Sequence, residues 1–585
     1  MTEFKLPELG ENLKSATIVK VNVKPGDTIK KGQTLLEVES EKASLEIPAP
    51  NDGVIKEIRV KVGDVVKIGQ VVFLIEGSSQ GSAEKLEARS QKSEITKQET
   101  QSKLAYDLPL TTYNSEKKDT KLVVIGGGPG GYAAAFLASD LGIQTTLVDL
   151  DVNPGGVCLY RGCIPSKALL HAARVISESK EASHFGIDFG APKIDLEKLR
   201  GWKESVVSKL TSGLGQLTKQ RKITFIQGRA SFLDSNTIKI TKPDGQTQNL
   251  SFETAILATG SRPIMIPNLP KSPRILDSTT ALDLENIPKN LLVVGAGYIG
   301  LELGTVYAQL GSDVSVVEMT PLVLPGADRD LASVLHKRIE KIFKAIMLET
   351  KLSKVEDIGT ALKVTFETKD GKTNIQEFEK ILIAIGRRPV TTDLGLENTK
   401  VQLTEKGFVK VDGARKTTDP SIYAIGDIAG EPMLAHKASH EGLTAVEAIA
   451  GHKVAFEPNA IPAVVFTDPE IAWCGLTETQ AQKENRTVTV VKFPWGASGR
   501  ALTLDRTDGL TKLLVDPVTE RILGVAIVGV GAGELIAEGV LAIEMGAVVN
   551  DLKMTIHPHP TTSETMMESA EVFFGQSTHI YRPKK

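Results

Sequence analysis

The chain has 585 residues, of which 41% are hydrophobic and 24% charged, as is typical of a soluble globular protein with several domains. Its 69 basic and 72 acidic residues leave a formal net charge of -3, which argues against a protein that binds nucleic acid through a basic surface. No run of about 18 uninterrupted apolar residues occurs, and the N-terminus shows neither a signal peptide nor a transit peptide. We therefore expect a cytoplasmic protein without membrane insertion.

The first 77 residues contain an internal repeat. The stretch VKVNVKPGDTIKKGQTLLEVE returns 37 positions later as KEIRVKVGDVVKIGQVVFLIE, so that Gly26 and Asp27 are matched by Gly63 and Asp64. Alternating apolar residues separated by Gly-Asp turns predict short antiparallel strands in each half. Two such halves can bury their apolar faces against each other, which predicts a small all-β domain with pseudo-twofold symmetry.

Between the two halves lies EVESEKASLEIPAP, whose central Lys42 is expected at an exposed hairpin tip. An ordinary surface lysine is the alternative. The region resembles lipoyl domains, in which a lysine at such a tip carries lipoate in amide linkage. A biotin domain would have methionine on both sides of the lysine, where this chain has Glu41 and Ala43. The resemblance implies lipoate bound covalently to Lys42.

Residues 78–118 follow, and their first part is rich in Ser, Gln, Lys and Glu. Such a segment buries too little apolar surface to offset the entropy of ordering, so we predict a flexible, disordered linker. An inert spacer is the alternative to an arm that carries Lys42 between sites.

The run KLVVIGGGPGGYAAAFLA begins as a buried strand and passes through Gly126, Gly128 and Gly131 into an alanine-rich helix. In dinucleotide-binding folds such glycines allow a tight turn, a close approach to pyrophosphate and close helix–strand packing. A second strand ends at Asp149, where a carboxylate can bind a ribose. These features predict a dinucleotide site.

The same pattern returns in LLVVGAGYIGLELG, which contains Gly295, Gly297 and Gly300 and is followed by a strand that ends at Glu318. Two such units imply two dinucleotides. A carboxylate at Glu318 should repel a 2′-phosphate, which favours NAD over NADP.

Shortly after the first unit comes GGVCLYRGCIPSK, with Cys158 and Cys163 five positions apart. This is not the Cys-x-x-Cys spacing of zinc ribbons and no second pair completes four ligands, so we expect no metal. Two buried thiols at the start of a helix are one interpretation. A redox-active disulfide is the other, because thiols near a helix N-terminus have a lowered pKa and exchange readily. Cys474 has no neighbouring cysteine in the sequence and is predicted to serve packing.

GGVCLYRGCIPSK resembles the active-site sequence of the flavin-dependent pyridine nucleotide-disulfide oxidoreductases. The resemblance continues through ATGSRP, AIGRRP, YAIGDIAGEPMLAHKASHEG and HPHPTTSE, and covers Lys121 to about Glu571. Within that family, GCIPSK and Glu318 are similar to the dihydrolipoamide dehydrogenase branch. Glutathione-type reductases place arginines for NADP at that position, and mercuric reductases end in a vicinal cysteine pair that this chain lacks.

The resemblance implies an α/β fold with two Rossmann-like dinucleotide-binding domains, for FAD and for NAD, and an α+β dimerisation domain. An all-β lipoyl domain, a flattened barrel, precedes them on the flexible linker. The expected boundaries are 1–77 for the lipoyl domain, 78–118 for the linker, 119–265 and 391–460 for the FAD-binding domain, 266–390 for the NAD-binding domain, and 461–585 for the dimerisation domain.

The resemblance also implies cofactor contacts. Those expected for FAD are Gly126, Gly128, Gly131, Asp149, Gly155, Gly156, Val157, Cys158, Lys167, Ala230, Asp427, Met433, Leu434, Ala435 and His436. Those expected for NAD are Gly295, Gly297, Tyr298, Gly300, Glu318, Leu352 and Gly386. Lys167 should lie beside the flavin nitrogen that exchanges hydride, paired with Glu302. Tyr160 and Arg161 stand where Asn and Val are usual, and could alter access to the cysteines or their potential.

The C-terminal HPHPTTSE contains His557, His559 and Glu564. Oxidation of a dithiol needs a base near neutral pH, and imidazole titrates in that range. A carboxylate would fix the tautomer of that base. The resemblance implies that His559, with Glu564, reaches the cysteines of the other subunit in an obligate homodimer; His557 is the alternative base.

The resemblance therefore implies an NAD-dependent dihydrolipoamide dehydrogenase of a 2-oxo acid dehydrogenase complex, with the pyruvate complex as candidate and its acyltransferase core as partner. A substrate thiolate attacks Cys158, and Cys163 passes the electrons to FAD and then to NAD. Attaching the carrier lysine to the enzyme raises their effective concentration. One alternative is another NAD(P)H-dependent flavin disulfide reductase, and a second is a non-catalytic structural member of the complex that presents Lys42.

Overall fold

The computed structural model describes residues 2–6, 15–30, 33–39, 44–49, 51–76 and 118–581. They belong to two compact units, an N-terminal unit that ends at Thr111 and a C-terminal unit that begins at Thr112. The carrier position Lys42 and the linker predicted for 78–118, apart from Lys118, lie outside the described residues.

The N-terminal unit consists of two antiparallel sheets, which confirms the all-β prediction. One has the order β1-β8-β6-β3, with bounds Thr2–Lys5, Val71–Glu76, Gly53–Ile58 and Thr28–Ile29. The other has the order β5-β4-β2-β7, with bounds Ser44–Pro48, Thr34–Glu39, Ser15–Val21 and Val65–Lys67. Inward side chains of both sheets, among them Ile18, Leu36, Ile55 and Phe73, form one buried core.

The sequence repeat appears as a repeated turn. The backbone N–H of Lys24 donates to Oδ2 of Asp27 at 2.7 Å, and the N–H of Lys61 donates to Oδ2 of Asp64 at 2.9 Å. The glycine of each Gly-Asp turn has a left-handed φ, +97° in the first copy and +94° in the second. Because a side chain disfavours that conformation, glycine recurs at both turns.

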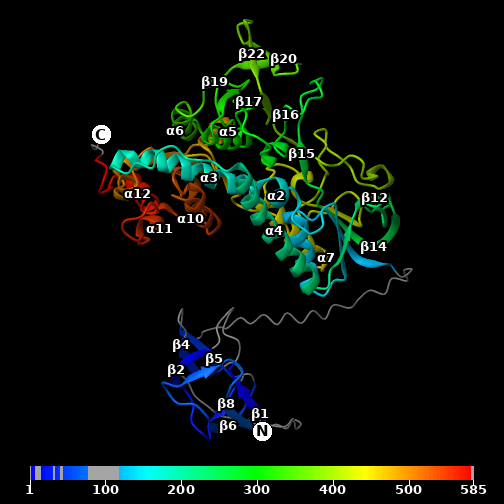
Figure 1. Ribbon diagram of the computed structural model, residues 1–585, viewed down its shortest axis with the longest axis vertical. Coiled ribbons are helices and arrows are strands. Elements are labelled where there is room, and N and C mark those ends of the chain that lie inside the picture. Colours follow the sequence, from blue (N-terminus) through cyan, green and yellow to red (C-terminus); the bar gives the residue numbers. More distant parts are fainter. Residues whose placement is uncertain are drawn as a thin grey trace. The chain divides into compact units, whose positions relative to one another are not determined.

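The C-terminal unit begins with a sheet of the order β11-β10-β9-β14-β13-β12, to which β25 adds by pairing with β14. In that order the bounds are Thr224–Gln227, Thr145–Asp149, Thr120–Ile125, Thr247–Leu257, Thr237–Thr241, Arg229–Asp234, and Ile422–Ala424 for β25. Pairing is parallel from β11 to β14 and with β25, and antiparallel from β14 to β12. Helices α1 (Pro129–Asp140) and α7 (Ala435–Ile449) pack against each other beside this sheet (Figure 1).

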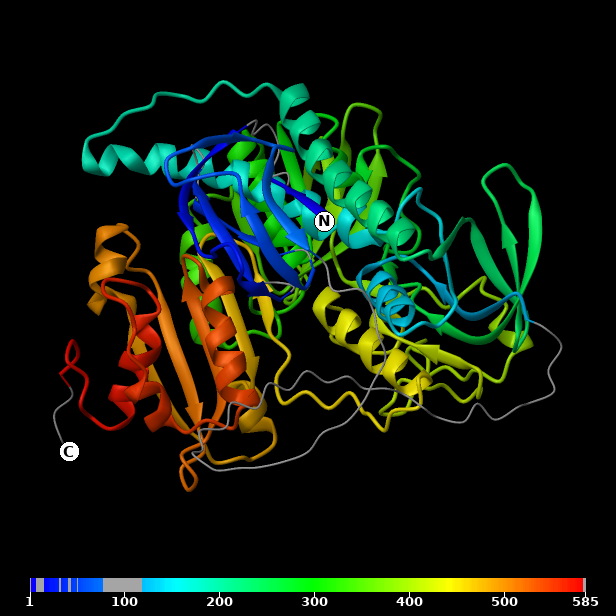
Figure 2. The same ribbon diagram turned by 90° about the horizontal axis from the view of Figure 1, so that it is seen from below.

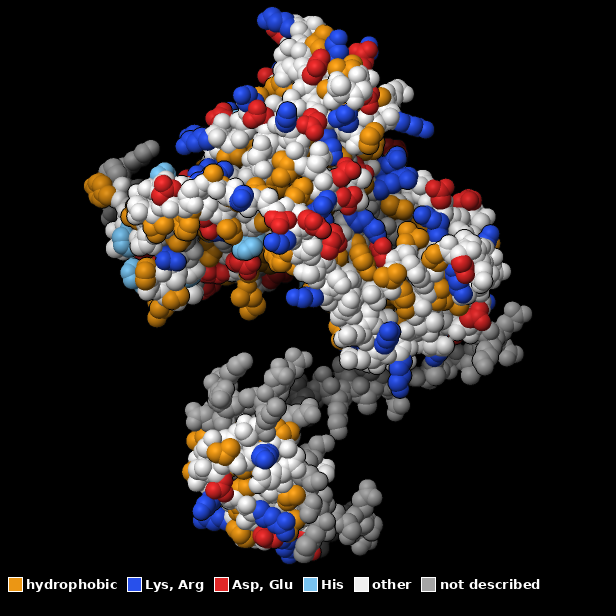
Figure 3. Space-filling view, viewed as in Figure 1, with side chains coloured by type: hydrophobic (Ala, Val, Ile, Leu, Met, Phe, Trp, Pro, Cys, Tyr) orange, Lys and Arg blue, Asp and Glu red, His pale blue; other side chains and the backbone are white. Residues whose placement is uncertain are grey.

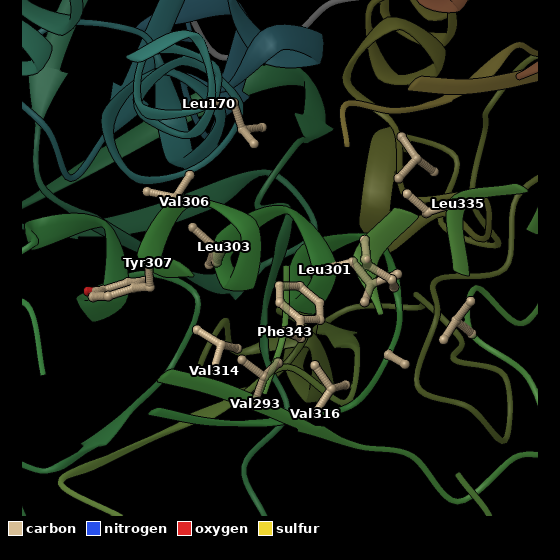
Figure 4. Close-up of a cluster of buried hydrophobic side chains, with 14 of the residues drawn as sticks. Leu170, Val293, Leu301, Leu303, Val306, Tyr307, Val314, Val316, Leu335 and Phe343 are labelled. Atoms are coloured by element: carbon tan, nitrogen blue, oxygen red, sulfur yellow. The ribbon is translucent and has the colours of Figure 1, made fainter. Parts of the chain in front are cut away.

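A second sheet, β16-β23-β17-β18-β19, is entirely parallel, with bounds Ile275–Leu276, Lys380–Ile383, Asn290–Val294, Asp313–Val317 and Ala345–Met347. It carries α5 (Tyr298–Leu310) and α6 (Arg329–Ile339). Side chains of β17, β18 and α5 meet those of α6 and of α3 (Cys163–Glu181) in one buried cluster (Figure 4). The antiparallel strands β20, β21 and β22 (Thr350–Asp357, Leu362–Thr368 and Thr373–Phe378) form an adjoining three-stranded sheet.

The last sheet is antiparallel, in the order β26-β27-β30-β29-β28, with bounds Ala463–Val465, Glu470–Gly475, Ile522–Gly529, Leu510–Val515 and Thr489–Pro494. Its helices are α8 (Glu478–Lys483), α9 (Gly499–Thr503), α10 (Ala532–Glu544), α11 (Val549–Met554) and α12 (Glu564–Phe573). Figure 2 shows these orange strands and red helices as one sheet with helices packed on it.

Two further features connect the sheets. A ribbon of β15 (Ser261–Pro263) and β24 (Arg387–Pro389) joins the first sheet to the second. Helix α2 (Gly156–Arg161) leads directly into α3 (Cys163–Glu181), which packs against α5 and against α4 (Leu196–Gln220) (Figure 1). Short 3₁₀ turns complete the unit at Ala182–Phe185, Thr280–Asp283, Leu396–Asn398, Gly426–Ile428 and Trp495–Ala497. The mixed α/β architecture predicted from the sequence is confirmed.

Within the described ranges, the helices are all too short or too polar to cross a bilayer. On the face shown in Figure 3, Lys and Arg side chains alternate with Asp and Glu side chains without gathering by sign. This distribution agrees with the near-balanced formal charge.

Candidate active site

A cavity of about 520 Å³ lies where the sheet that contains β9, the sheet that contains β17 and the β15–β24 ribbon meet. Thirteen of the residues predicted for catalysis or cofactor binding line it: Gly126, Gly128, Asp149, Gly156, Val157, Cys158, Cys163, Lys167, Tyr298, Glu302, Asp427, Met433 and Ala435. They come from the turn before α1, the end of β10, helices α2, α3 and α5, the 3₁₀ turn Gly426–Ile428 and the start of α7, so the fold gathers residues that are far apart in the sequence.

The first glycine-rich turn is shaped to receive a phosphate. Gly126 has a φ of +105°, and a Cβ on Gly131 would lie 1.8 Å from the carbonyl oxygen of Gly126, so neither position accepts a side chain. A Cβ on Gly128 would meet no atom within 4 Å, so the helix N-terminus stands open there. Asp149 accepts the N–H of Gly127, and its other oxygen accepts the N–H of Asp151 at 2.9 Å.

The second glycine-rich turn repeats this geometry closely. Gly295 has a φ of +103°, a Cβ on Gly300 would lie 2.2 Å from the Gly295 carbonyl oxygen, and Gly297 faces open space. One carboxylate oxygen of Glu318, Oε2, accepts the N–H of Ala296 at 2.8 Å, and the other, Oε1, accepts the N–H of Thr320 at 2.9 Å. Each turn therefore combines an open helix N-terminus with a carboxylate fixed by two backbone amides, which fits the pyrophosphate and ribose of a dinucleotide.

The two cysteines occupy adjoining helices beside the first turn. Cys158 lies within α2 and is half-buried, whereas Cys163 begins α3 and is more accessible; both are free thiols. The hydrogen bond from Cys158, and beyond it the Lys167 ammonium, outweigh burial and lower the pKa of Cys163 to about 7. The same hydrogen bond raises the pKa of Cys158. The hydrogen bond between the two thiols and the Lys167 charge therefore favour Cys163 over Cys158 as the site of the thiolate.

Lys167 and Glu302 form an ion pair across the cavity wall. Nζ of Lys167 lies 2.8 Å from Oε2 of Glu302, whose side chain is 3% exposed. Ser166 donates to the same oxygen at 3.3 Å, and the other oxygen accepts the N–H of Phe466 at 2.9 Å. The pairing predicted from the sequence is thus present in the structure.

Ser261 and Arg387 also line this cavity, although they were not among the predicted site residues. Ser261 donates to Oδ2 of Asp427 at 2.5 Å and accepts from Nε of Arg387 at 2.7 Å, so a relay across the ribbon holds the Asp427 carboxylate. Both residues lie in the motifs ATGSRP and AIGRRP. The motifs were the available signal, but only the β15–β24 pairing brings them together.

The histidines of HPHPTTSE have different surroundings. His559 is 74% exposed, and its Nδ1 lies 2.8 Å from Oε1 of Glu564. Burial alone would raise the pKa of Glu564, but the N–H of Thr561 and the His559 ring outweigh it and lower that pKa. His557 is buried, with Nε2 2.8 Å from Oε1 of Glu538 and Nδ1 3.0 Å from the Thr555 carbonyl oxygen. His557 is fully engaged in the fold, whereas His559 is presented to solvent.

Tyr160 and Arg161 both contact the segment that follows Asp149, although they lie between the cysteines in sequence. The Tyr160 hydroxyl donates to the carbonyl oxygen of Asn153 at 3.1 Å, and Arg161 pairs with Asp151.

The other predicted cofactor residues lie outside the lining of this cavity: Gly131, Gly155, Ala230, Leu434, His436, Gly295, Gly297, Gly300, Glu318, Leu352 and Gly386. The second glycine-rich turn therefore lies outside the cavity lining, and of the residues predicted for NAD only Tyr298, the first residue of α5, lines the cavity.

An acidic group of Asp328, Asp330 and Glu478 lies between α6 and the last sheet. Nζ of Lys512, which is fully buried, is 2.6 Å from Asp328, 2.8 Å from Asp330 and 3.3 Å from Glu478. A lysine ammonium thus occupies the centre of this group and joins α6 to strand β29.

Three comparisons with known proteins agree with this geometry. The family model "Pyridine nucleotide-disulphide oxidoreductase" matches residues 120–442, and the model for its dimerisation domain matches 461–570. Residues 2–75 match the model "Biotin-requiring enzyme", which covers biotin and lipoyl domains.

Curated relatives are dihydrolipoyl dehydrogenases. That of Haemophilus influenzae is 48% identical over 471 residues, which are 80% of this chain and 98% of that protein. That of Geobacillus stearothermophilus is 45% identical over 462 residues, which are 79% of this chain and 98% of that protein. The solved structure of LpdA from Mycobacterium tuberculosis superposes with a TM-score of 0.72 at 29% identity, over 78% of this chain and 99% of that one.

Proposed function

Because this chain belongs to the dihydrolipoyl dehydrogenases of the pyridine nucleotide-disulphide oxidoreductase family, we propose that it oxidises dihydrolipoyl groups with NAD. The reaction converts a dithiol and NAD into a cyclic disulfide, NADH and a proton. The observation that carries the proposal is the Cys158–Cys163 pair, whose thiols are hydrogen-bonded to each other in the cavity beside the first glycine-rich turn.

FAD and NAD are the cofactors of this family, and the two glycine-rich turns are built to hold them. We assign FAD to the first turn and the cavity, with Asp149 at its ribose and Asp427 at its ribityl chain. NAD is assigned to the second turn, with Glu318 at its ribose. A bound FAD would supply the two-electron redox chemistry that links the cysteine dithiol to NAD.

The protein supplies thiol chemistry and proton transfer. His559 removes a proton from the substrate, and the resulting thiolate attacks Sγ of Cys158 in the oxidised pair, so that Cys163 leaves as a thiolate. The second substrate thiol then attacks the mixed disulfide, which closes the lipoyl ring and releases Cys158. Glu564 orients His559, and the low pKa of Cys163 makes it the better leaving group.

His559 acts, we propose, on the cysteines of a partner subunit. An apolar surface beside it supports this arrangement: Leu541 is 62% exposed, Met545 76%, Met554 69% and Ile556 95%. The bond between His557 and Glu538 holds the histidine segment to α10, next to that surface. Because monomers rarely expose so many large apolar side chains in one place, a second copy is the natural cover. Residues 461–570 match the family's dimerisation domain.

We further propose that Lys42 carries lipoate and that the chain serves a 2-oxo acid dehydrogenase complex through its acyltransferase core, with pyruvate as the candidate 2-oxo acid. The match of residues 2–75 and the register that pairs Glu39 with Ser44, directly before and after 40–43, support the carrier assignment. The domain boundaries given above for the FAD-binding, NAD-binding and dimerisation domains belong to the same proposal.

The test is NADH formation from NAD and free dihydrolipoamide by the full-length protein, with NADP in parallel and Cys158→Ser as the blank. Turnover with NAD that is lost in Cys158→Ser would establish the reaction. An FAD-loaded protein without turnover would contradict it. Mass spectrometry of the intact chain and of Lys42→Arg, after incubation with a lipoate ligase, tests the carrier lysine separately.

A further inference from the structure

Arg161 and Asp151 form an ion pair on the wall of the cavity. Nη2 of Arg161 lies 2.5 Å from Oδ1 and 2.6 Å from Oδ2 of Asp151, and their side chains are 36% and 21% exposed. Arg161 is the last residue of α2, and Asp151 comes two residues after the end of β10 at Asp149. The pair therefore joins the helix that carries Cys158 to the segment that carries the ribose-binding carboxylate.

Both the position and the unused donors of Arg161 point to a ligand. Val157 and Arg161 are four residues apart in α2, so they share one helix face, and both line the cavity. Nη2 makes both bonds to Asp151. Within the described part of the chain, Nε and Nη1 donate to no protein acceptor.

The two carboxylates on the cavity wall also favour a cation beside a bound phosphate. Asp149 and Asp151 both line it, and Asp149 contacts Gly127, the residue before Gly128, where the pyrophosphate of a dinucleotide comes nearest to the backbone. A ligand that brings two further negative charges would meet two carboxylates, and like charges at such distances repel. Four further cations line the same cavity: Lys167, Arg387 and Arg262 are engaged by Glu302, Ser261 and Thr392, and Arg229 is the first residue of β12. Arg161 can offset the phosphate charge because a guanidinium binds a carboxylate and a phosphate oxygen at once.

We propose that Arg161 is an FAD-binding residue: Asp151 orients its guanidinium, and the remaining N–H groups donate to the pyrophosphate of FAD. The inference rests on the assignment of FAD to this cavity. It gives the residue between the two cysteines a role in holding the flavin cofactor, in place of the effect on access or potential expected from the sequence.

The test measures binding to the apoprotein and needs no turnover. Apo forms of the wild type, Arg161→Met, Asp151→Asn and the double variant are titrated with FAD by flavin fluorescence, and with ADP by calorimetry. Arg221→Met is the matched control, because Nε of Arg221 lies 2.9 Å from Oδ1 of Asp140 on the same domain, away from the cavity. We expect Arg161→Met to weaken both FAD and ADP by about tenfold or more, since a charge-assisted hydrogen bond to phosphate is lost. Asp151→Asn should weaken them only a few-fold, and Arg221→Met not at all.

Equal losses in Arg161→Met, Asp151→Asn and the double variant would overturn the proposal, because Arg161 would then act only through its ion pair. Unchanged ADP affinity in Arg161→Met would also overturn it. Circular dichroism of each apo form checks folding; if Arg161→Met does not fold, Arg161→Gln decides, with the same tenfold loss expected and an unchanged affinity contradicting the assignment. An enzyme that binds FAD but does not oxidise dihydrolipoamide would refute the proposed reaction and leave this inference standing.

Discussion

Lys167 of α3 and Glu302 of α5 meet at 2.8 Å, although 135 positions separate them in the sequence. The same carboxylate accepts the N–H of Phe466, whose ring lies 4.5 Å from the Lys167 ammonium. A single side chain that is 3% exposed thus fixes the relative positions of three segments around the cavity. Of the two charges in this pair, the Lys167 ammonium lowers the pKa of Cys163, whereas the Glu302 carboxylate raises it.

Replacing Glu302 by Gln should therefore lower the stability of the protein. The ammonium of Lys167 loses its counter-charge, and we expect a loss of about 1 to 3 kcal/mol of unfolding free energy, less than for a fully buried pair because Lys167 is 31% exposed. Thermal denaturation of the holoprotein measures this. Glu178→Gln, which breaks the exposed pair with Arg174, is the control and should cost less than 1 kcal/mol. Equal melting temperatures of the two variants would contradict the assignment.

Removal of the His559 imidazole, the proposed base, should slow the deprotonation of the substrate thiol. His559→Gln is expected to lower kcat/KM for dihydrolipoamide by about 10²- to 10⁴-fold, the usual worth of a general base, while FAD binding stays intact. Steady-state kinetics with free dihydrolipoamide is the measurement. His557→Gln should instead lower the melting temperature with a much smaller effect on kcat/KM, because His557 is bonded to Glu538 and buried. A larger kinetic loss in His557→Gln than in His559→Gln would reverse the two roles.

The reactivity of the reduced cysteines should depend on pH in a defined way. With a pKa of about 7, Cys163 becomes a thiolate as the pH rises through 7, so its alkylation by iodoacetamide should reach half its maximal rate near that pH. Because the pKa in the folded protein lies below the ordinary thiol pKa of 9.0, this thiolate stabilises the reduced fold above pH 9, and that stabilisation disappears as the pH falls through 7.

Mass spectrometry of the reduced protein after brief alkylation identifies the site at each pH. Cys158→Ala removes the hydrogen bond that is the main cause of the shift, so the midpoint should move upward. Cys474 is the internal control, because burial raises its pKa to about 12 and it should stay unmodified throughout. An unmoved midpoint in Cys158→Ala would show that another group sets the pKa.

The choice of nicotinamide cofactor should follow the charge at Glu318. Its carboxylate is held by two backbone amides at the edge of the second turn, and there it can accept from a ribose hydroxyl but repels a 2′-phosphate. Glu318→Ser is expected to lower kcat/KM for NAD by about tenfold and to raise that for NADP. The ratio of the two constants is the readout, and an unchanged ratio would place the ribose elsewhere.

Loss of the buried Lys512 ammonium should lower the free energy of unfolding. Its ammonium is the shared partner of Asp328, Asp330 and Glu478, and Lys512→Met leaves the buried Asp328 carboxylate without a counter-charge, which should cost about 3 to 5 kcal/mol. Differential scanning calorimetry tests this. Lys492→Met, which removes a lysine that is 36% exposed from the same group, should cost less. A smaller loss in Lys512→Met than in Lys492→Met would contradict the argument.

Several features could be read from the sequence because they depend on neighbouring residues. Glycine is required at Gly126 and Gly295 by a local left-handed φ, and the paired Gly-Asp turns of the N-terminal unit depend on local hydrogen bonds. The cysteine spacing and the motif HPHPTTSE are likewise local patterns. The fold class, the two dinucleotide units and the reactive residues followed from them.

Other features were decided only by tertiary structure, because they join residues with no local relation. The relay from Arg387 through Ser261 to Asp427 exists because an antiparallel ribbon connects two sheets. Arg161 lies between the two cysteines in the sequence, yet its side chain pairs with Asp151. The reason is that the face of α2 on which Val157 and Arg161 lie lines the cavity, as Asp151 does. A motif in the sequence indicates which chemistry a segment can perform, because it depends on neighbouring residues. Which side chains share a site, and which of their charges must be neutralised there, depends on how distant elements pack against each other.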